Sequence, residues 1–98
     1  MTTAQFESVA KIAICDYAED EFSLKLSAAD IETVWMCHII GNKKGLFIEY
    51  GQHSHRYYEV TWNAALDEMY VDVYKKQDKV TLDIDQVQGI IKRAEGKT

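Results

Sequence analysis

Two histidines separated by one residue, His53 and His55, are the first candidates for chemistry in this sequence. On extended backbone both imidazoles would point to one side, and imidazole is a common zinc ligand. A structural zinc site needs four ligands, and Cys37 and His38 on a neighbouring strand could supply the other two. Those two adjacent residues would face opposite ways on a strand, and the histidine pair falls in an expected loop. We therefore expect no bound metal or other cofactor, and a solvated loop whose histidines titrate near neutral pH.

The two cysteines, Cys15 and Cys37, could act as nucleophiles only if exposed and activated by a neighbouring base. Both are surrounded by apolar residues in the sequence, so we expect buried thiols that behave as small hydrophobic side chains. One pair could form one disulfide, which is far from the dense framework of a small secreted domain.

Paired carboxylates are plentiful, but catalysis needs them in a cleft with separated pKa values. Glu59 and Asp72 are expected on a flat outer face, the pair at 83 and 85 at a helix start, and residues 19–21 form a charge run. Residues 41–45, Gly-Asn-Lys-Lys-Gly, lack the spacing of a phosphate-binding loop and predict a hairpin turn. We expect no catalytic residues and no enzyme activity.

The composition fits one domain spanning residues 1–98. Apolar residues make up 47% and charged residues 28%, which excludes wholesale disorder. Eleven basic against 16 acidic residues give a net charge of −5, which disfavours a nucleic-acid binder. No apolar run approaches the ~18 residues that cross a bilayer, and the first residues lack the order of a signal peptide. We expect a cytoplasmic protein without membrane contact.

Two helices are predicted, one at each end of the chain. Residues 3 to about 21 carry a stripe with helical spacing and a capping box at Thr2 and Gln5. The stripe residues are Phe6, Val9, Ala10, Ala13 and Tyr17. A short closing helix follows Asp83 and ends at Gly96, and its apolar stripe is Ile84, Val87, Ile90 and Ile91.

Four strands are predicted between these helices. A capping box at 27–30 indicates one helical turn at 28–31, and the β-branched and aromatic residues that follow favour a strand at about 32–41 over a longer helix. Further strands are expected at 46–50, 56–62 and 68–74, with connections of about five residues. The order is αββββα: a four-stranded antiparallel meander with both helices packed on one face, in the α+β class.

Alternation within the third and fourth strands separates two faces. Tyr58, Val60, Trp62, Met69, Val71 and Val73 are assigned to the helix-covered core. The other face carries Tyr57, Glu59, Thr61, Glu68, Tyr70, Asp72 and Tyr74. That face is either a solvated surface supported by cross-strand tyrosine pairs or a docking surface whose carboxylates select a basic partner.

Three segments, Val34-Trp35-Met36-Cys37, residues 57–63 (Tyr-Tyr-Glu-Val-Thr-Trp-Asn) and residues 68–76 (Glu-Met-Tyr-Val-Asp-Val-Tyr-Lys-Lys), resemble a family of small phage and prophage proteins from Gram-positive bacteria. The similarity extends from about residue 31 to 76, and the family has no known function. The resemblance implies a bacterial host cytoplasm and an accessory role, and it supplies no catalytic residues.

Together these patterns predict a small non-catalytic protein that binds a bacterial host protein through its acidic, tyrosine-rich face. The expected contact residues are Tyr57, Glu59, Thr61, Tyr70, Asp72 and Tyr74. A homo-oligomer that pairs through its sheets is the alternative, and an unrecognised enzyme is a more distant one.

Overall fold

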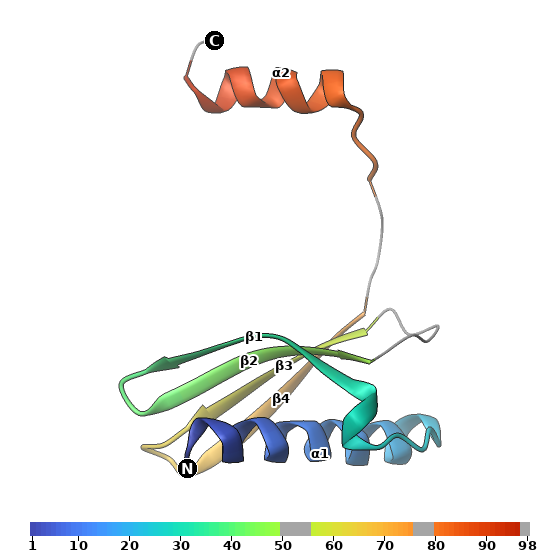
Figure 1. Ribbon diagram of the computed structural model, residues 1–98, viewed down its shortest axis with the longest axis vertical. Coiled ribbons are helices and arrows are strands. Elements are labelled where there is room, and N and C mark those ends of the chain that lie inside the picture. The colour runs from blue at the N-terminus through green and yellow to red at the C-terminus, as the bar shows by residue number, and fades with distance from the viewer. Residues whose placement is uncertain (50–55, 76–79, 97–98) are drawn as a thin grey trace.

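The structure of the chain is a computed structural model that describes residues 1–49, 56–75 and 80–96. Its elements are α1 (Thr3–Phe22), the 3₁₀ turn η1 (Ala28–Asp30), β1 (Ile31–Ile39), β2 (Asn42–Glu49), β3 (Arg56–Asn63), β4 (Glu68–Lys75) and α2 (Ile84–Ala94). The strands form one sheet in the order β1-β2-β3-β4, with every neighbouring pair antiparallel (Figure 1). The predicted α+β class and αββββα order are confirmed.

Helix α1 is defined at both ends by its own sequence. The Thr2 hydroxyl accepts from the Gln5 backbone N–H at 3.1 Å, and the Gln5 side chain accepts from the Thr2 N–H at 2.8 Å, as the predicted capping box requires. At the other end Ser23 adopts a left-handed conformation with φ of 54°. The buried line is Phe6, Ala10, Ile14 and Ala18, so Val9, Ala13 and Tyr17 of the predicted stripe lie on its flank.

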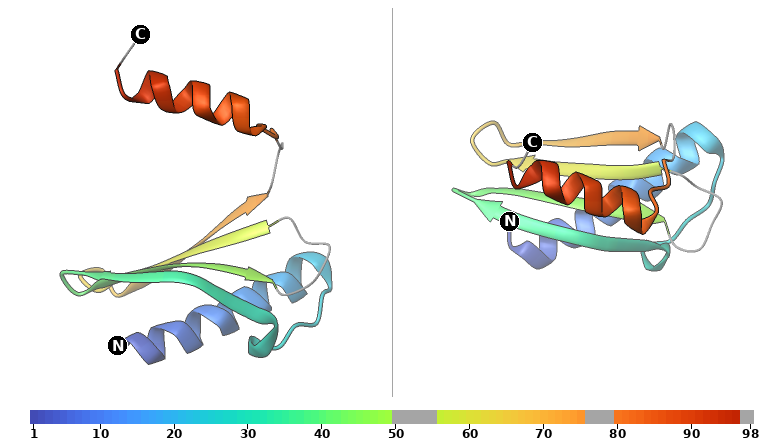
Figure 2. Two further views of the ribbon diagram at one scale, coloured as in Figure 1. Left: turned by 45° about the horizontal axis from the view of Figure 1, so that its top comes forward. Right: turned by 90° about the horizontal axis from the view of Figure 1, so that it is seen from above.

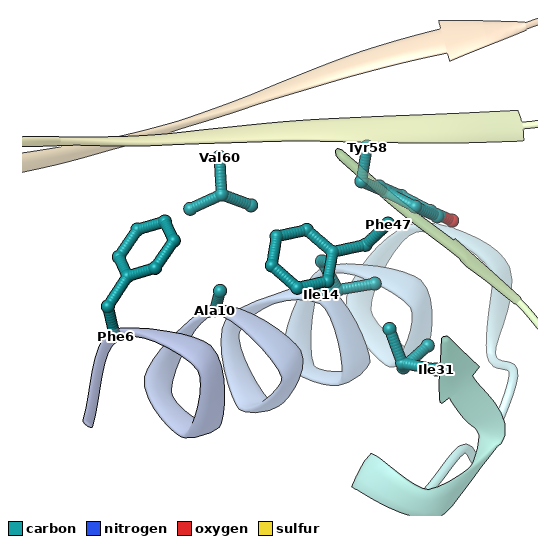
Figure 3. Close-up of a cluster of buried hydrophobic side chains, with 7 residues drawn as sticks. All are labelled: Phe6, Ala10, Ile14, Ile31, Phe47, Tyr58 and Val60. Carbon is teal, nitrogen blue, oxygen red and sulfur yellow. The ribbon is translucent and has the colours of Figure 1, made fainter. Parts of the chain in front are cut away.

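This buried line of α1 packs against the inner face of the sheet (Figure 3). Phe6 and Phe47 meet with ring centroids 6.4 Å apart. The cluster consists of Phe6, Ala10, Ile14, Ile31, Phe47, Tyr58 and Val60. Trp62, Met69, Val71 and Val73 pack against it half-buried, so the predicted core assignments of β3 and β4 are confirmed.

The β1–β2 hairpin is tighter than predicted. The turn consists of Ile40 and Gly41, with φ of 47° and 80°, and Ile39 already pairs with Asn42. Residues 42–45, expected in a loop, belong to β2 instead. Gly45 is needed there because a Cβ would lie 2.8 Å from Cε2 of the buried Phe47 ring.

A β-bulge in β1 reverses which side chains face the core. The pairing with β2 shifts between Thr33 and Trp35, so Val34 is an extra residue without a partner. Beyond the bulge Met36 packs against the core, whereas Trp35 is directed to the opposite face and stays 42% exposed.

The placement of α2 differs from the expectation that both helices pack on one face. Helix α1, with 20 residues and a length of about 30 Å, covers the inner face alone. Helix α2 lies on the other side of the sheet and stands clear of it (Figures 1 and 2), and none of its residues is buried. The outer face of the sheet, which we call the open face, is therefore uncovered.

Candidate functional site

All six predicted contact residues lie together on the open face. The register pairs Tyr57 with Tyr74, Glu59 with Asp72 and Thr61 with Tyr70, so the six form three cross-strand pairs on β3 and β4. The three tyrosines keep 38–51% of their surface exposed. Period-2 alternation was enough to find this half of the face, because neither strand contains a bulge.

The other half of the open face comes from β1 and β2 and is more apolar than expected. Ile48 pairs with Tyr57, and Trp35 pairs with Leu46, which in turn pairs with Glu59. Two rows therefore cross the sheet: Ile48–Tyr57–Tyr74 and Trp35–Leu46–Glu59–Asp72. Alternation around Phe47 could have revealed Leu46 and Ile48. Trp35 could not be assigned, because the bulge that turns it outward has no sequence signature.

Of the carboxylates on the open face, Glu59 is in an ion pair, whereas Asp72 and Glu68 are exposed. Lys44 Nζ forms an ion pair with Glu59 Oε1 at 3.2 Å, and both side chains are partly exposed. Asp72, directly opposite Glu59, is exposed, and Glu68 adds a further carboxylate at the end of β4. Carboxylates facing each other across a strand pair repel, so a cation from a partner would be favoured beside them.

A second polar cluster lies at the edge of the core, on the inner face. The Glu49 side chain is 1% exposed and accepts from the Tyr58 hydroxyl and from Arg56 Nη2, the latter at 3.2 Å. Arg56 Nε donates to the Tyr58 oxygen at 3.0 Å, and its guanidinium lies 4.0 Å from the centroid of the Phe22 ring. The sequence assigned Tyr58 to the core but gave no sign of its charged partners.

The pKa values of Tyr58 and Cys15 are both raised, which favours their protonated forms. Burial, followed by the hydrogen bond to Glu49, raises the pKa of Tyr58 to about 12. Burial, followed by the nearby carboxylates of Asp16, Asp30 and Glu49, also raises the pKa of the Cys15 thiol. A thiol nucleophile needs the opposite shift, and the hydrogen bonds among Glu49, Arg56 and Tyr58 join β2 to β3.

The remaining chemical candidates are dispersed. Cys15 is half-buried and Cys37 is exposed, which corrects the expectation of two buried thiols, because the bulge turns Cys37 to the open face. Asp83 caps α2 by accepting from the Gln86 N–H at 2.9 Å. Residues 53 and 55, the histidine pair, lie outside the described residues. Within the described ranges no three His, Cys, Asp or Glu side chains converge as a metal site.

A hollow of about 680 Å³ lies beside the start of α1, on the inner side of the sheet. It is lined by Met1, Ala4, Gln5, Ser8, Val9, Trp62 and Asp67. Asp67 is the one carboxylate in this lining. A pair of acid and base groups, which hydrolytic chemistry usually needs, is not assembled there.

Fold and site together define a small α+β protein with one helix-covered sheet face and one uncovered aromatic and acidic face. The chain belongs to a family of unknown function, DUF6275, which it matches over residues 7–84. The match begins within α1, at its fifth residue, includes the whole sheet and ends at the first residue of α2. No curated protein and no solved structure matches the chain. Neither helix in the described part of the chain is long and apolar enough to span a bilayer.

Proposed function

We propose that this chain is a non-catalytic protein-binding module whose open face is the contact surface. The observation that carries the proposal is the exposure of four large aromatic side chains on one uncovered sheet face. They are Trp35, Tyr57, Tyr70 and Tyr74, and each keeps 38–51% of its surface exposed. Tryptophan and tyrosine dominate the energetics of protein interfaces, because they contribute large contact areas with few rotatable bonds.

The charge pattern specifies the chemistry of the partner. Within the described strands the carboxylates of Glu59, Glu68 and Asp72 on this face outnumber its lysine, Lys44, and Glu59 already pairs with Lys44. A partner with lysine or arginine beside an apolar patch would match both features. The chain's net charge of −5 extends the same preference to long-range attraction.

We further propose that the chain is a phage- or prophage-encoded accessory protein of a Gram-positive bacterium, that it acts in the cytoplasm and that its partner is a host protein. The support is the resemblance of residues 31–76 to such proteins. A homo-oligomer remains the alternative use of the open face, and α2 gives a specific reason to consider it.

The test is affinity capture of host protein by the purified full-length chain. Tyr70→Ala removes an exposed ring, and Asp72→Lys reverses the charge directly opposite Glu59. Asp16→Lys is the matched control, because Asp16 is an exposed carboxylate on α1, on the other side of the sheet.

We expect the Asp16→Lys control to capture the same host protein as the unaltered chain. Both open-face variants should bind that protein at least about tenfold more weakly, because an interface contact worth about 1.4 kcal/mol changes the affinity tenfold. Capture should also weaken at high salt, because exposed charges are screened. Equal capture by both open-face variants and the unaltered chain would exclude the open face as the binding surface.

A further inference from the structure

Helix α2 is amphipathic, and the described part of the chain buries none of its residues. Its 11 residues carry an apolar stripe at helical spacing, and a capping box begins it. Yet Ile84, Ile90 and Ile91 are 66%, 40% and 50% exposed, and Val80 and Leu82 just before it are exposed as well. A helix of three turns is marginal in water without an apolar face to cover. Helix α2 therefore requires a partner surface.

The open face offers α2 an uncovered surface with exposed aromatic side chains. It lies on the side of the sheet on which α2 is found (Figure 2), and its row Trp35–Leu46–Glu59–Asp72 extends over all four strands. Lys92 and Arg93 in the last turn of α2 lie on the side of the helix away from the stripe, so they stay in solvent when the stripe packs on the sheet.

Helix α2 stands away from its own sheet. Residues 80–83 lie on the open side of the sheet, and α2 then runs across at a distance from its own strands (Figures 1 and 2). Eight residues, 76–83, separate β4 from α2, and a chain of that length spans at most about 29 Å. A second sheet, turned so that its open face meets the first, would place each α2 against the other copy.

We propose that two copies of this chain exchange their α2 helices, so that each helix packs its apolar stripe on the open face of the other copy. This inference rests on the proposed function of the open face and describes how binding of a host protein to that face is regulated. In the dimer the two helices occupy the surface, and a host protein must displace one of them. Exchange of an identical element is a low-cost route to a closed, two-fold symmetric dimer.

The area available is that of a stable dimer. Four aromatic side chains of 150–250 Å² each, exposed to 38–51%, offer about 350 Å² per open face. The exposed isoleucines, Val80 and Leu82 offer a comparable area from the helix side. Two such contacts bury about 1,400 Å², within the roughly 1,200–2,000 Å² of specific interfaces.

Sedimentation equilibrium of the pure full-length chain tests the exchange. We expect a dimer of twice the 11.3 kDa chain mass at about 10 µM. Ile91→Glu in the stripe and Tyr74→Glu on the open face should each raise the dissociation constant at least about 100-fold, because symmetry places every substitution in both contacts. Gly89→Glu is the control: it puts the same charge on the opposite side of α2, where a new side chain meets nothing within 4 Å.

A mixing experiment separates helix exchange from simple face-to-face pairing. The Ile91→Glu chain keeps an intact open face, and the Tyr74→Glu chain keeps an intact helix. Mixed together they can form one intact contact, so a heterodimer should appear where each variant alone is monomeric. Circular dichroism should show that both variants fold, because Ile91 and Tyr74 are exposed in the single chain.

A monomeric unaltered chain, a dimer that Ile91→Glu leaves unchanged, or failure of the mixed variants to associate would each overturn the exchange. The assay contains no host protein, so its outcome is independent of the capture experiment. If the exchange holds and the face binds a host protein, Ile91→Glu should capture more of that protein than the unaltered chain. A dimer without any captured protein would overturn the host-binding proposal alone.

Discussion

The buried hydroxyl of Tyr58 offers the sharpest test of how the core is held together. In the structure it donates to the Glu49 carboxylate and accepts from Arg56. Tyr58→Phe removes the hydroxyl and retains the ring, which is fully buried. The carboxylate then loses one of the two side-chain donors that the described residues give it, and Arg56 Nε loses an acceptor.

The expected cost at neutral pH follows from the charge of the acceptor. A hydrogen bond to a charged group contributes about 1.5–3 kcal/mol, and the ring packing is unchanged. We therefore expect the free energy of unfolding of Tyr58→Phe to fall by that amount. For a domain of this size the midpoint of thermal unfolding should fall by about 6–24 °C.

The stability that Tyr58 contributes should decrease at alkaline pH. The pKa of Tyr58 rises from 10.0 to about 12 on folding, so the folded state holds the proton more tightly. This contribution is fully present below pH 10 and is lost as the pH rises from about 10 to 12, while the unfolded chain ionises first. The free energy of unfolding lost in this way amounts to about 2–3 kcal/mol. The Tyr58→Phe chain has no hydroxyl to ionise, so its stability does not fall for this reason.

Urea unfolding followed by circular dichroism at pH 7 to 11.5 measures both effects. The stability difference between the unaltered chain and Tyr58→Phe should shrink above pH 10, while other titrating groups cancel in that difference. Tyr57→Phe is the matched control, because Tyr57 is the next residue on β3 and is 44% exposed. It should change stability by no more than about 0.5 kcal/mol.

A constant difference from pH 7 to 11.5 would refute the argument that burial and Glu49 hold the Tyr58 proton. A loss at neutral pH no larger than that of Tyr57→Phe would refute the hydrogen-bond argument itself.

Three further substitutions test the fold by urea or thermal unfolding. Ile40→Asn should raise stability by about 1 kcal/mol, because a β-branched residue at φ of 47° is strained and Asn-Gly is preferred in such a two-residue turn; an unchanged midpoint would contradict this strain. Gly45→Ala should lower stability by about 1–3 kcal/mol, because its Cβ would press into the buried Phe47 ring and the Met36 side chain; a neutral outcome would mean that the ring can move. Glu49→Gln should cost about 2–4 kcal/mol, because it removes the charge that the guanidinium faces in a nearly dry site; stability within 0.5 kcal/mol of the unaltered chain would show that the pair is unimportant.

Local patterns in the sequence were sufficient for the elements and for half of the open face. Helical spacing and capping residues located both helices, and alternation placed Tyr58 and Val60 inside and Tyr70 and Asp72 outside. These signals depend on residues two to four positions apart, which regular backbone geometry alone relates to one another.

The errors arose where one residue changes the phase of a strand or where distant segments meet. The extra residue Val34 turned Trp35 and Cys37 outward, and the tight turn at Ile40 moved the start of β2. The cluster of Glu49, Tyr58 and Arg56 could not be predicted, because its members lie on two strands and meet only when the sheet forms.

The sequence by itself determined that this protein has an amphipathic sheet between two capped helices, since patterns of apolar residues and caps are local. The tertiary structure decided which face of the sheet α1 covers, and within the described residues it leaves α2 and the open face uncovered. The physical reason is that covering a face depends on the path and reach of the chain between elements, which no local pattern encodes.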